Sequence, residues 1–277
     1  MIKFLIPINF APYTINAVNY CRALVNRVKG EITLLYCYTK VVGENSEARV
    51  NKINSREDAL AELQKLKKHI LDSLPEKDNI SVNMRVIDGY PEDVIVKFSE
   101  EYRPDLIVMG TKSKGETIKE LLGSVTFDVI KKVSFPVMAV PNDYKLNIDK
   151  LTNILFINDF ENCEYTSLHK LVRLVGAFDT KIHNVQHCPH GKDKIDPKLM
   201  KEYTEYMHST YRNQNMICDY ICDDDLIVST QEYIDAHNID LMAITRRKRN
   251  IISQILQPSR TKKILFNAEI PTLFFHQ

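Results

Sequence analysis

Glycine and serine residues within residues 104–141 have the types and spacing of a loop that binds phosphate. The segment reads PDLIVMGTKSKGETIKELLGSVTFDVIKKVSFPVMAVP. An apolar run ends at Gly110, and the pair Gly123-Ser124 directly precedes an apolar-periodic run. Glycine at the end of a strand and at the start of a helix lets backbone N–H groups approach an anion without an intervening side chain. The segment therefore predicts a strand, a loop, a helix and a second strand, with a phosphate cradle at the carboxyl end of a parallel sheet.

The bulk composition limits the classes of partner. The chain has 277 residues, of which 44% are apolar, and a net charge of +1, which suits one large domain or two ordinary ones. Because the charge is balanced and no apolar run approaches the roughly 20 residues of a spanning helix, we expect neither nucleic acid nor a membrane as a partner. The six cysteines form no dense framework, so we expect reduced thiols and a cytoplasmic location.

The chain contains two copies of one pattern. Residues 3–10 (KFLIPINF) are echoed by residues 153–160 (NILFINDF), and residues 105–109 by residues 240–244. Apolar side chains at three- and four-residue spacing follow the opening run of each copy and predict helices, the first of which we expect to end at Gly30. Strands that alternate with helices predict an α/β domain, with a parallel sheet and helices on both faces.

The repeat also predicts the domain organisation. We place one domain at residues 1–144 and the other at residues 145–277, with the boundary in a polar stretch after the first copy's last strand. We expect the two halves to pair through residues 137–140 and 272–275 as a pseudo-dimer within one chain, because such pairing would cover two sheet edges. Further association into a homodimer stays open, and so does the identity of a protein partner.

The motifs resemble those of the universal stress protein family in its tandem two-domain form. The opening strand is similar to an ILxPxD pattern, and residues 110–124 are similar to a G-x2-G-x9-G-[S/T] loop. The resemblance implies two doubly wound α/β domains, each with a five-stranded parallel sheet. It also implies a stress-response protein whose first domain binds ATP, with Mg²⁺, or another adenine nucleotide where the strand order reverses. The nucleotide would act as a regulatory switch.

The resemblance also carries over individual site residues. In ATP-binding members, the backbone amides and the hydroxyl at Gly110, Gly123 and Ser124 hold the phosphates and the ribose. Other matching positions line the nucleotide with apolar or backbone contacts; these are Pro7, Cys37, Met109 and Val125.

Two positions depart from the family motif. The motif's second glycine is Ser113, and the aspartate after the first strand, which engages the base and ribose end, is Asn9. Loss of a charged hydrogen bond costs about 1.5–3 kcal/mol, or roughly one to two decades in affinity. We therefore expect weak binding in the first domain. The alternative is a scaffold or adaptor with both pockets degenerate, in which Gly110 and Gly123 are turn glycines.

The second half departs further from the motif. Thr245, Lys248 and Pro258 replace the three glycines, although Asp159 and Ser259 match the family pattern. Proline removes a backbone donor from the cradle, and threonine adds a branched side chain where phosphate would approach. The second domain should not bind ATP in the family manner.

Two polar clusters in the second half have competing interpretations. The run of basic residues at 246–249 is either an anion contact or a solvated loop, and we favour the solvated loop. His187, Cys188 and His190 lie close enough in sequence to form part of a zinc site, and whether they bind metal stays open. Because strand cysteines are more often core residues, we predict no metal.

No arrangement of a nucleophile and a base stands out in the sequence. The chain has no G-x-S-x-G sequence and no Walker loop ending in G-K-[ST]. We therefore predict that the protein is not an enzyme, while a slow ATPase activity stays open.

Overall fold

The structure is a computed structural model, and its contacts divide the chain into two compact units. The described residues are 1–39, 53, 55–74, 80–112, 123–145, 151–158, 164–187, 197–212, 214–221, 226–246 and 270–276. The first unit comprises Met1–Gly115 and Lys119–Leu146, and Asn147–Gln277 lie in the second. Among the described helices, none has the length and apolar character needed to cross a membrane.

The first unit alternates strands with helices along the chain. In order, its elements are β1 (Ile2–Pro7), α1 (Pro12–Val28), β2 (Gly30–Tyr38), α2 (Arg56–Asp72), β3 (Ser81–Asp88), α3 (Pro91–Tyr102), β4 (Leu106–Thr111), α5 (Ser124–Lys132) and β5 (Val137–Pro141). Within the described residues the five strands form one parallel sheet in the order β3-β2-β1-β4-β5. The doubly wound parallel sheet that the sequence predicts is therefore confirmed.

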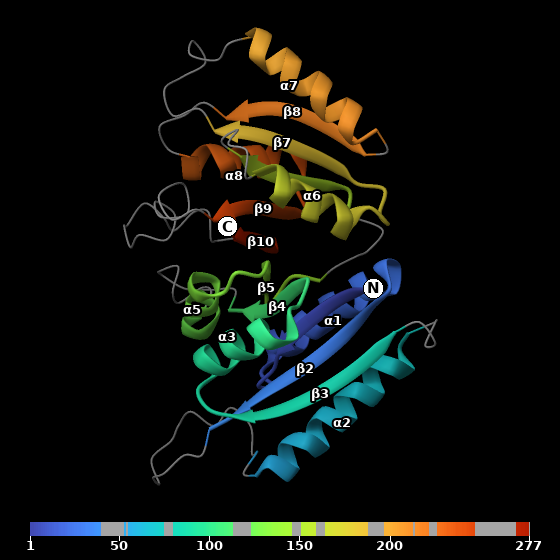
Figure 1. The fold of residues 1–277 in the computed structure, drawn as a ribbon, viewed down its shortest axis with the longest axis vertical. Helices are drawn as coiled ribbons and strands as arrows, with labels where there is room; N and C mark the ends of the chain where they lie inside the picture. Colours follow the sequence, from blue (N-terminus) through green and yellow to red (C-terminus); the bar gives the residue numbers. More distant parts are fainter. Residues whose placement is uncertain are drawn as a thin grey trace. The chain divides into compact units, whose positions relative to one another are not determined.

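The strand order reverses between β1 and β4, which lie side by side at the centre of the sheet. The chain first winds from β1 toward the edge at β3 and then from β4 toward the edge at β5. Because crossover connections are right-handed, the helices of these two halves lie on opposite faces of the sheet. Figure 1 shows α1 and α2 on one face of this sheet and α3 and α5 on the other, and α3 contacts α5. The carboxyl ends of β1 and β4 thus meet at a topological switch point, where open α/β sheets bind ligands.

The central strands are buried on both sides because they carry almost continuous apolar sequence. Every residue of β4 is buried, and β1 is buried except at Lys3. Helix α1 packs over β1 and β4 through its apolar face, which consists of Ala17, Val18, Tyr20, Cys21, Leu24 and Val25 with Thr14.

The end of α1 differs from the sequence-based prediction. We expected Gly30 to end the helix, but the left-handed residue after α1 is Lys29, with φ 53°, and Gly30 is the first residue of β2. A Cβ at Gly30 would lie 2.6 Å from the carbonyl oxygen of Ile2 and 2.8 Å from the ring of Phe4. Glycine is therefore required here for close approach to β1, and not for a helix cap.

The second unit repeats the plan. Its elements are β6 (Asn153–Asn158), α6 (Glu164–Val175), β7 (Lys181–His187), α7 (Pro197–Thr210), β8 (Asn215–Ile221), α8 (Leu226–His237), β9 (Leu241–Arg246) and β10 (Thr272–His276). Within the described residues its strands form a parallel sheet in the order β10-β9-β6-β7-β8. Written from its other edge, this order is β8-β7-β6-β9-β10, which matches the order β3-β2-β1-β4-β5 of the first unit strand for strand. The predicted tandem repeat is therefore confirmed.

Candidate functional site

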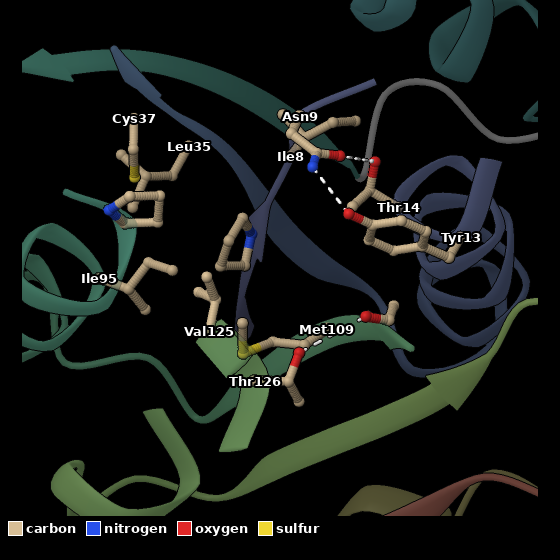
Figure 2. A pocket seen from close by; sticks show the side chains of 13 residues that line it. Ile8, Asn9, Tyr13, Thr14, Leu35, Cys37, Ile95, Met109, Val125 and Thr126 are labelled. Carbon is tan, nitrogen blue, oxygen red and sulfur yellow. Dashed lines mark hydrogen bonds between the residues drawn. The ribbon is translucent and has the colours of Figure 1, made fainter. Parts of the chain in front are cut away.

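A hollow lies at the switch point of the first unit (Figure 2). It is open to solvent, and about 510 Å³ within it, part of which is open solvent, is not filled by protein atoms. Its lining comes from the ends of β1, β2 and β4 and from the first turns of α1, α3 and α5. The lining residues are Pro7, Ile8, Asn9, Tyr13, Thr14, Leu35, Cys37, Pro91, Ile95, Met109, Gly110, Val125 and Thr126.

One side of the hollow is apolar. Leu35, Cys37 and Ile95 lie together on the side toward β2 and α3, as Figure 2 shows. Burial and, to a lesser extent, the nearby Glu92 carboxylate raise the pKa of the Cys37 thiol to about 12. At neutral pH the thiol is therefore protonated and behaves as a small apolar wall.

The other side is polar and is organised by Asn9. Its Oδ1 accepts a hydrogen bond from the backbone N–H of Ala11 (3.0 Å) and shares the Thr14 hydroxyl hydrogen (3.1 Å) with the Ala11 carbonyl oxygen (2.9 Å). Its Nδ2 donates to the Tyr13 hydroxyl (2.8 Å). The bond to the Ala11 N–H fixes which end of the amide is the oxygen, because a backbone N–H can only donate. The side chain at position 9 thus joins the end of β1 to the first turn of α1.

The turn between β1 and α1 has an unusual backbone. Phe10 has φ 62°, a left-handed conformation that is rare for a bulky residue and costs about 1–2 kcal/mol. Its ring contacts that of Tyr36 on β2, with the ring centroids 5.6 Å apart. The contact packs this turn against β2.

Gly110 closes the floor of the hollow at the end of β4. A Cβ at this position would overlap the carbonyl group of Tyr13 and lie 2.9 Å from the backbone nitrogen of Thr14. The first turn of α1 therefore packs directly on the Cα of Gly110. The Gly110 carbonyl oxygen is 3.5 Å from the Thr126 hydroxyl, which links β4 to α5.

Gly123 lies at the N-terminus of α5 and differs from Gly110 in its surroundings. It has φ 78° and ψ 151°, a region that is essentially restricted to glycine. No described atom lies within 4 Å of the place where its Cβ would be, and no side chain of the described residues makes a capping hydrogen bond to the helix. The N–H groups of the first helical turn have no intrahelical acceptors, so the positive end of the helix dipole lies at this end of α5.

The structure brings most of the sequence-predicted site residues together. The residues around the hollow are Pro7, Asn9, Cys37, Met109, Gly110 and Val125. Gly123 and Ser124 lie at the start of α5, and Ser113 lies outside the described residues. Their part in ligand binding stays a prediction.

Several lining residues were missed by the sequence analysis. Tyr13 and Thr14 could have been found from their spacing to Asn9, because they lie four and five residues beyond it, at the start of a predicted helix. Pro91 and Ile95 start α3, whose position depends on β3, and no residues were assigned to that strand from the sequence.

The corresponding edge of the second unit is described only in part. Thr245, which replaces the first glycine, is buried near the end of β9 and opposite Phe275 of β10. The other motif positions of this half lie outside the described residues; these are Asp159, Lys248, Pro258 and Ser259, with the basic run after residue 246. That this half does not bind ATP therefore stays a prediction.

His183 belongs to a buried polar network in the second unit. Its Nδ1 lies 3.0 Å from the Tyr233 hydroxyl and its Nε2 lies 3.4 Å from Asn153 Oδ1. The Tyr233 hydroxyl is also 3.3 Å from Asp219 Oδ2, and the Tyr233 ring stacks on that of His237. These contacts join β6, β7 and β8 to α8.

The possible zinc site at His187, Cys188 and His190 involves residues that the structure does not describe in full. Cys188 and His190 lie outside the described residues, and the side chain of His187 is not described either. Within the described part of the chain, no three histidine, cysteine, aspartate or glutamate side chains form a group that could hold a metal ion.

Comparison with known proteins identifies the family. Residues 1–141 match the model of the Universal stress protein family. The chain belongs to the universal stress protein family. Universal stress protein MJ0531 of Methanocaldococcus jannaschii is 29% identical over 147 residues, which cover 52% of this chain and 84% of that protein. Universal stress protein MJ0577 of the same organism is 35% identical over 101 residues, covering 36% of this chain and 58% of that protein.

Solved structures extend the likeness to the second unit. A universal stress protein from Archaeoglobus fulgidus superposes with a TM-score of 0.77, covering 99% of this chain and 96% of that chain. The sequence identity is 16%, so this likeness shows the fold alone. The chain is therefore a universal stress protein of the tandem two-domain type.

Proposed function

We propose that the first unit binds an adenine nucleotide in the hollow at its switch point and that binding regulates contacts with a partner protein. The main support for the proposal is that the hollow has an apolar side and a polar side. An apolar side at Leu35, Cys37 and Ile95 faces a polar side at Asn9 and Tyr13, and helix α5 starts directly after Gly123.

Each part of the hollow suits one part of a nucleotide. The apolar side matches the flat, weakly polar faces of a purine base. The N-terminus of α5 suits the phosphates, because backbone N–H groups and the helix dipole both favour an anion. Glycine at position 123 adds no side chain there, and no described atom lies within 4 Å of where its Cβ would be.

The open hollow favours a binding protein over a scaffold with a closed pocket. A scaffold that had lost its ligand would be expected to fill the cleft with a side chain. Instead, the described residues leave a solvent-open space, and glycine is kept at Gly123, where the backbone requires it.

The lining residues support a regulator more than an enzyme. Among the described residues that line the hollow, no histidine or carboxylate is available to activate water. Mg²⁺ would enter with ATP, bound to its phosphates. We therefore infer that the nucleotide acts by shifting the conformations of residues near the site, in a cytoplasmic protein whose thiols, such as Cys21 and Cys37, stay reduced.

The proposal is tested by calorimetric titration of the protein with Mg-ATP, AMP and cyclic AMP. The account predicts saturable binding of at least one of these, with micromolar to millimolar affinity, and loss of binding in a Gly123→Val variant. A Tyr206→Phe variant, altered at an exposed side chain of the second unit, serves as the control and should bind like the wild type. Absence of heat at millimolar ligand would overturn the proposal and favour the scaffold.

A further inference from the structure

The Tyr13 hydroxyl is a hydrogen-bond donor that faces the hollow, and it donates to no residue in the part of the chain that the structure describes. It accepts from Asn9 Nδ2 at 2.8 Å, so its own hydrogen must point elsewhere. No bond donated by this hydroxyl occurs within the described residues, and Tyr13 lines the hollow. Figure 2 shows the ring on the α1 side, opposite Cys37 and Ile95.

Two contacts hold Tyr13 in place before any ligand arrives. Its backbone packs on the Cα of Gly110, and its hydroxyl is held by the Asn9 amide. Because Asn9 is in turn fixed by Ala11 and Thr14, little side-chain freedom remains to be lost on binding. A ligand binds more tightly to a donor fixed in this way, chiefly because little side-chain entropy is lost when the hydrogen bond forms.

The amide at position 9 determines the direction of the bond to Tyr13. An aspartate there would present only acceptor oxygens, so the tyrosine hydrogen would point at the carboxylate. Asn9 instead donates to the tyrosine oxygen, which leaves the tyrosine hydrogen available. The departure from aspartate therefore leaves a hydrogen-bond donor at position 13.

We propose that Tyr13 determines specificity for a ribose, by donating a hydrogen bond from its hydroxyl to the 2′- or 3′-oxygen of the bound nucleotide. The inference rests on the proposed function. The location of the group favours the ribose over the phosphates. Tyr13 lies in the first turn of α1, against Gly110 at the end of β4, while the start of α5 is the proposed phosphate site. A hydroxyl oxygen can accept this bond, and a deoxyribose lacks one such oxygen.

The experiment is a thermodynamic cycle in which a substitution in the protein is combined with the removal of one hydroxyl group from the ligand. The dissociation constants of ATP, 2′-deoxy-ATP and 3′-deoxy-ATP are measured by calorimetry for the wild type and for Tyr13→Phe. We expect Tyr13→Phe to weaken ATP binding about 3- to 10-fold, the effect of one neutral hydrogen bond. One of the two deoxynucleotides should bind the wild type more weakly than ATP by a similar factor, and the variant should bind it and ATP alike.

Matched measurements separate this inference from its alternatives. Tyr206→Phe removes the hydroxyl of an exposed tyrosine in the second unit and should leave all affinities unchanged. An equal loss for ATP and both deoxynucleotides in Tyr13→Phe would overturn the ribose assignment, and so would no loss. If the wild type binds no nucleotide, the proposed function fails together with this inference. If the wild type binds ATP but Tyr13→Phe behaves like the wild type, only this inference fails.

Discussion

Gly110 on β4 and Tyr13 on α1 are in direct backbone contact. The Cα of Gly110 faces the carbonyl group of Tyr13 with no room for a Cβ between them. The contact joins the two central elements of the switch point and fixes the height of α1 above the sheet. It also sets where the Tyr13 side chain enters the hollow. The glycine that the sequence marked as a phosphate contact therefore has a packing role as well.

Gly110→Ala should destabilise the protein strongly. The new methyl group meets backbone atoms of Tyr13 and Thr14, which cannot rotate away as a flexible side chain could. We expect a loss of about 3 kcal/mol in the free energy of unfolding, the upper end of typical overpacking costs. Urea denaturation monitored by circular dichroism measures this loss. A change below about 0.5 kcal/mol would show that α1 does not pack on β4 as described.

Gly123→Ala should have a smaller effect on stability and a larger one on ligand binding. Space is available at Gly123, but φ 78° and ψ 151° are unfavourable for alanine, at a cost of about 1–2 kcal/mol. Relief of that strain would rotate the N–H groups at the start of α5. We expect nucleotide affinity to fall roughly tenfold or more, the effect of losing one hydrogen bond to a charged group. Calorimetry and urea denaturation of the same variant distinguish the two effects, and unchanged affinity would argue against a phosphate site at α5.

Cys37 should react slowly with alkylating agents. Its pKa is raised to about 12 by burial and by Glu92, so at pH 8 only a small fraction is the reactive thiolate. We expect iodoacetamide to modify Cys37 at least about 100-fold more slowly in the folded protein than in the urea-unfolded chain. Mass spectrometry of the modified peptide gives both rates, and Cys37→Ser identifies the peptide. Similar rates in the two states would contradict the raised pKa.

Acid should weaken the fold through His183. Burial, followed by His237 and Lys181, lowers the pKa of His183 from 6.5 to about 4, while Asp219 acts in the opposite direction. As the pH falls from about 6.5 to 4, the unfolded chain binds a proton that the folded chain does not, so the free energy of unfolding decreases. The loss from this residue is at most about 3 kcal/mol.

The matched variant for this prediction is His183→Gln, which keeps a polar side chain and cannot titrate in this range. Urea denaturation of both proteins at pH 7, 5.5 and 4.5 gives the difference in their stabilities. Other groups contribute equally to both proteins, so the difference should shrink as the pH falls. A constant difference would show that His183 is not buried in its neutral form.

The fold could be predicted because the same pattern of strands and helices occurs in both halves of the sequence. The sequences of residues 3–10 and 153–160 share a pattern, and buried strands such as β4 are almost continuously apolar. The end of α1 could not be placed correctly, because the choice between Lys29 and Gly30 depends on the approach of Ile2 on a neighbouring strand. That approach is a tertiary contact, and helix-capping rules do not contain it.

The site could be predicted only where a motif marks it. The glycines and Asn9 stand at fixed positions in a loop pattern, so their place at one edge of the sheet follows from the topology. Tyr13 has no motif, and its significance depends on a side-chain bond to Asn9 and on a backbone contact with Gly110. The sequence therefore indicated the location of the hollow, while the donor at its polar side required the structure.

The most direct test of the account is a crystal structure of the protein grown with Mg-ATP. The account predicts one nucleotide in the first unit, with its base against Pro7 and Cys37 and its phosphates at the N–H groups that follow Gly123. Electron density for a nucleotide only in the second unit, or an empty hollow in a crystal whose protein binds ATP in solution, would contradict it.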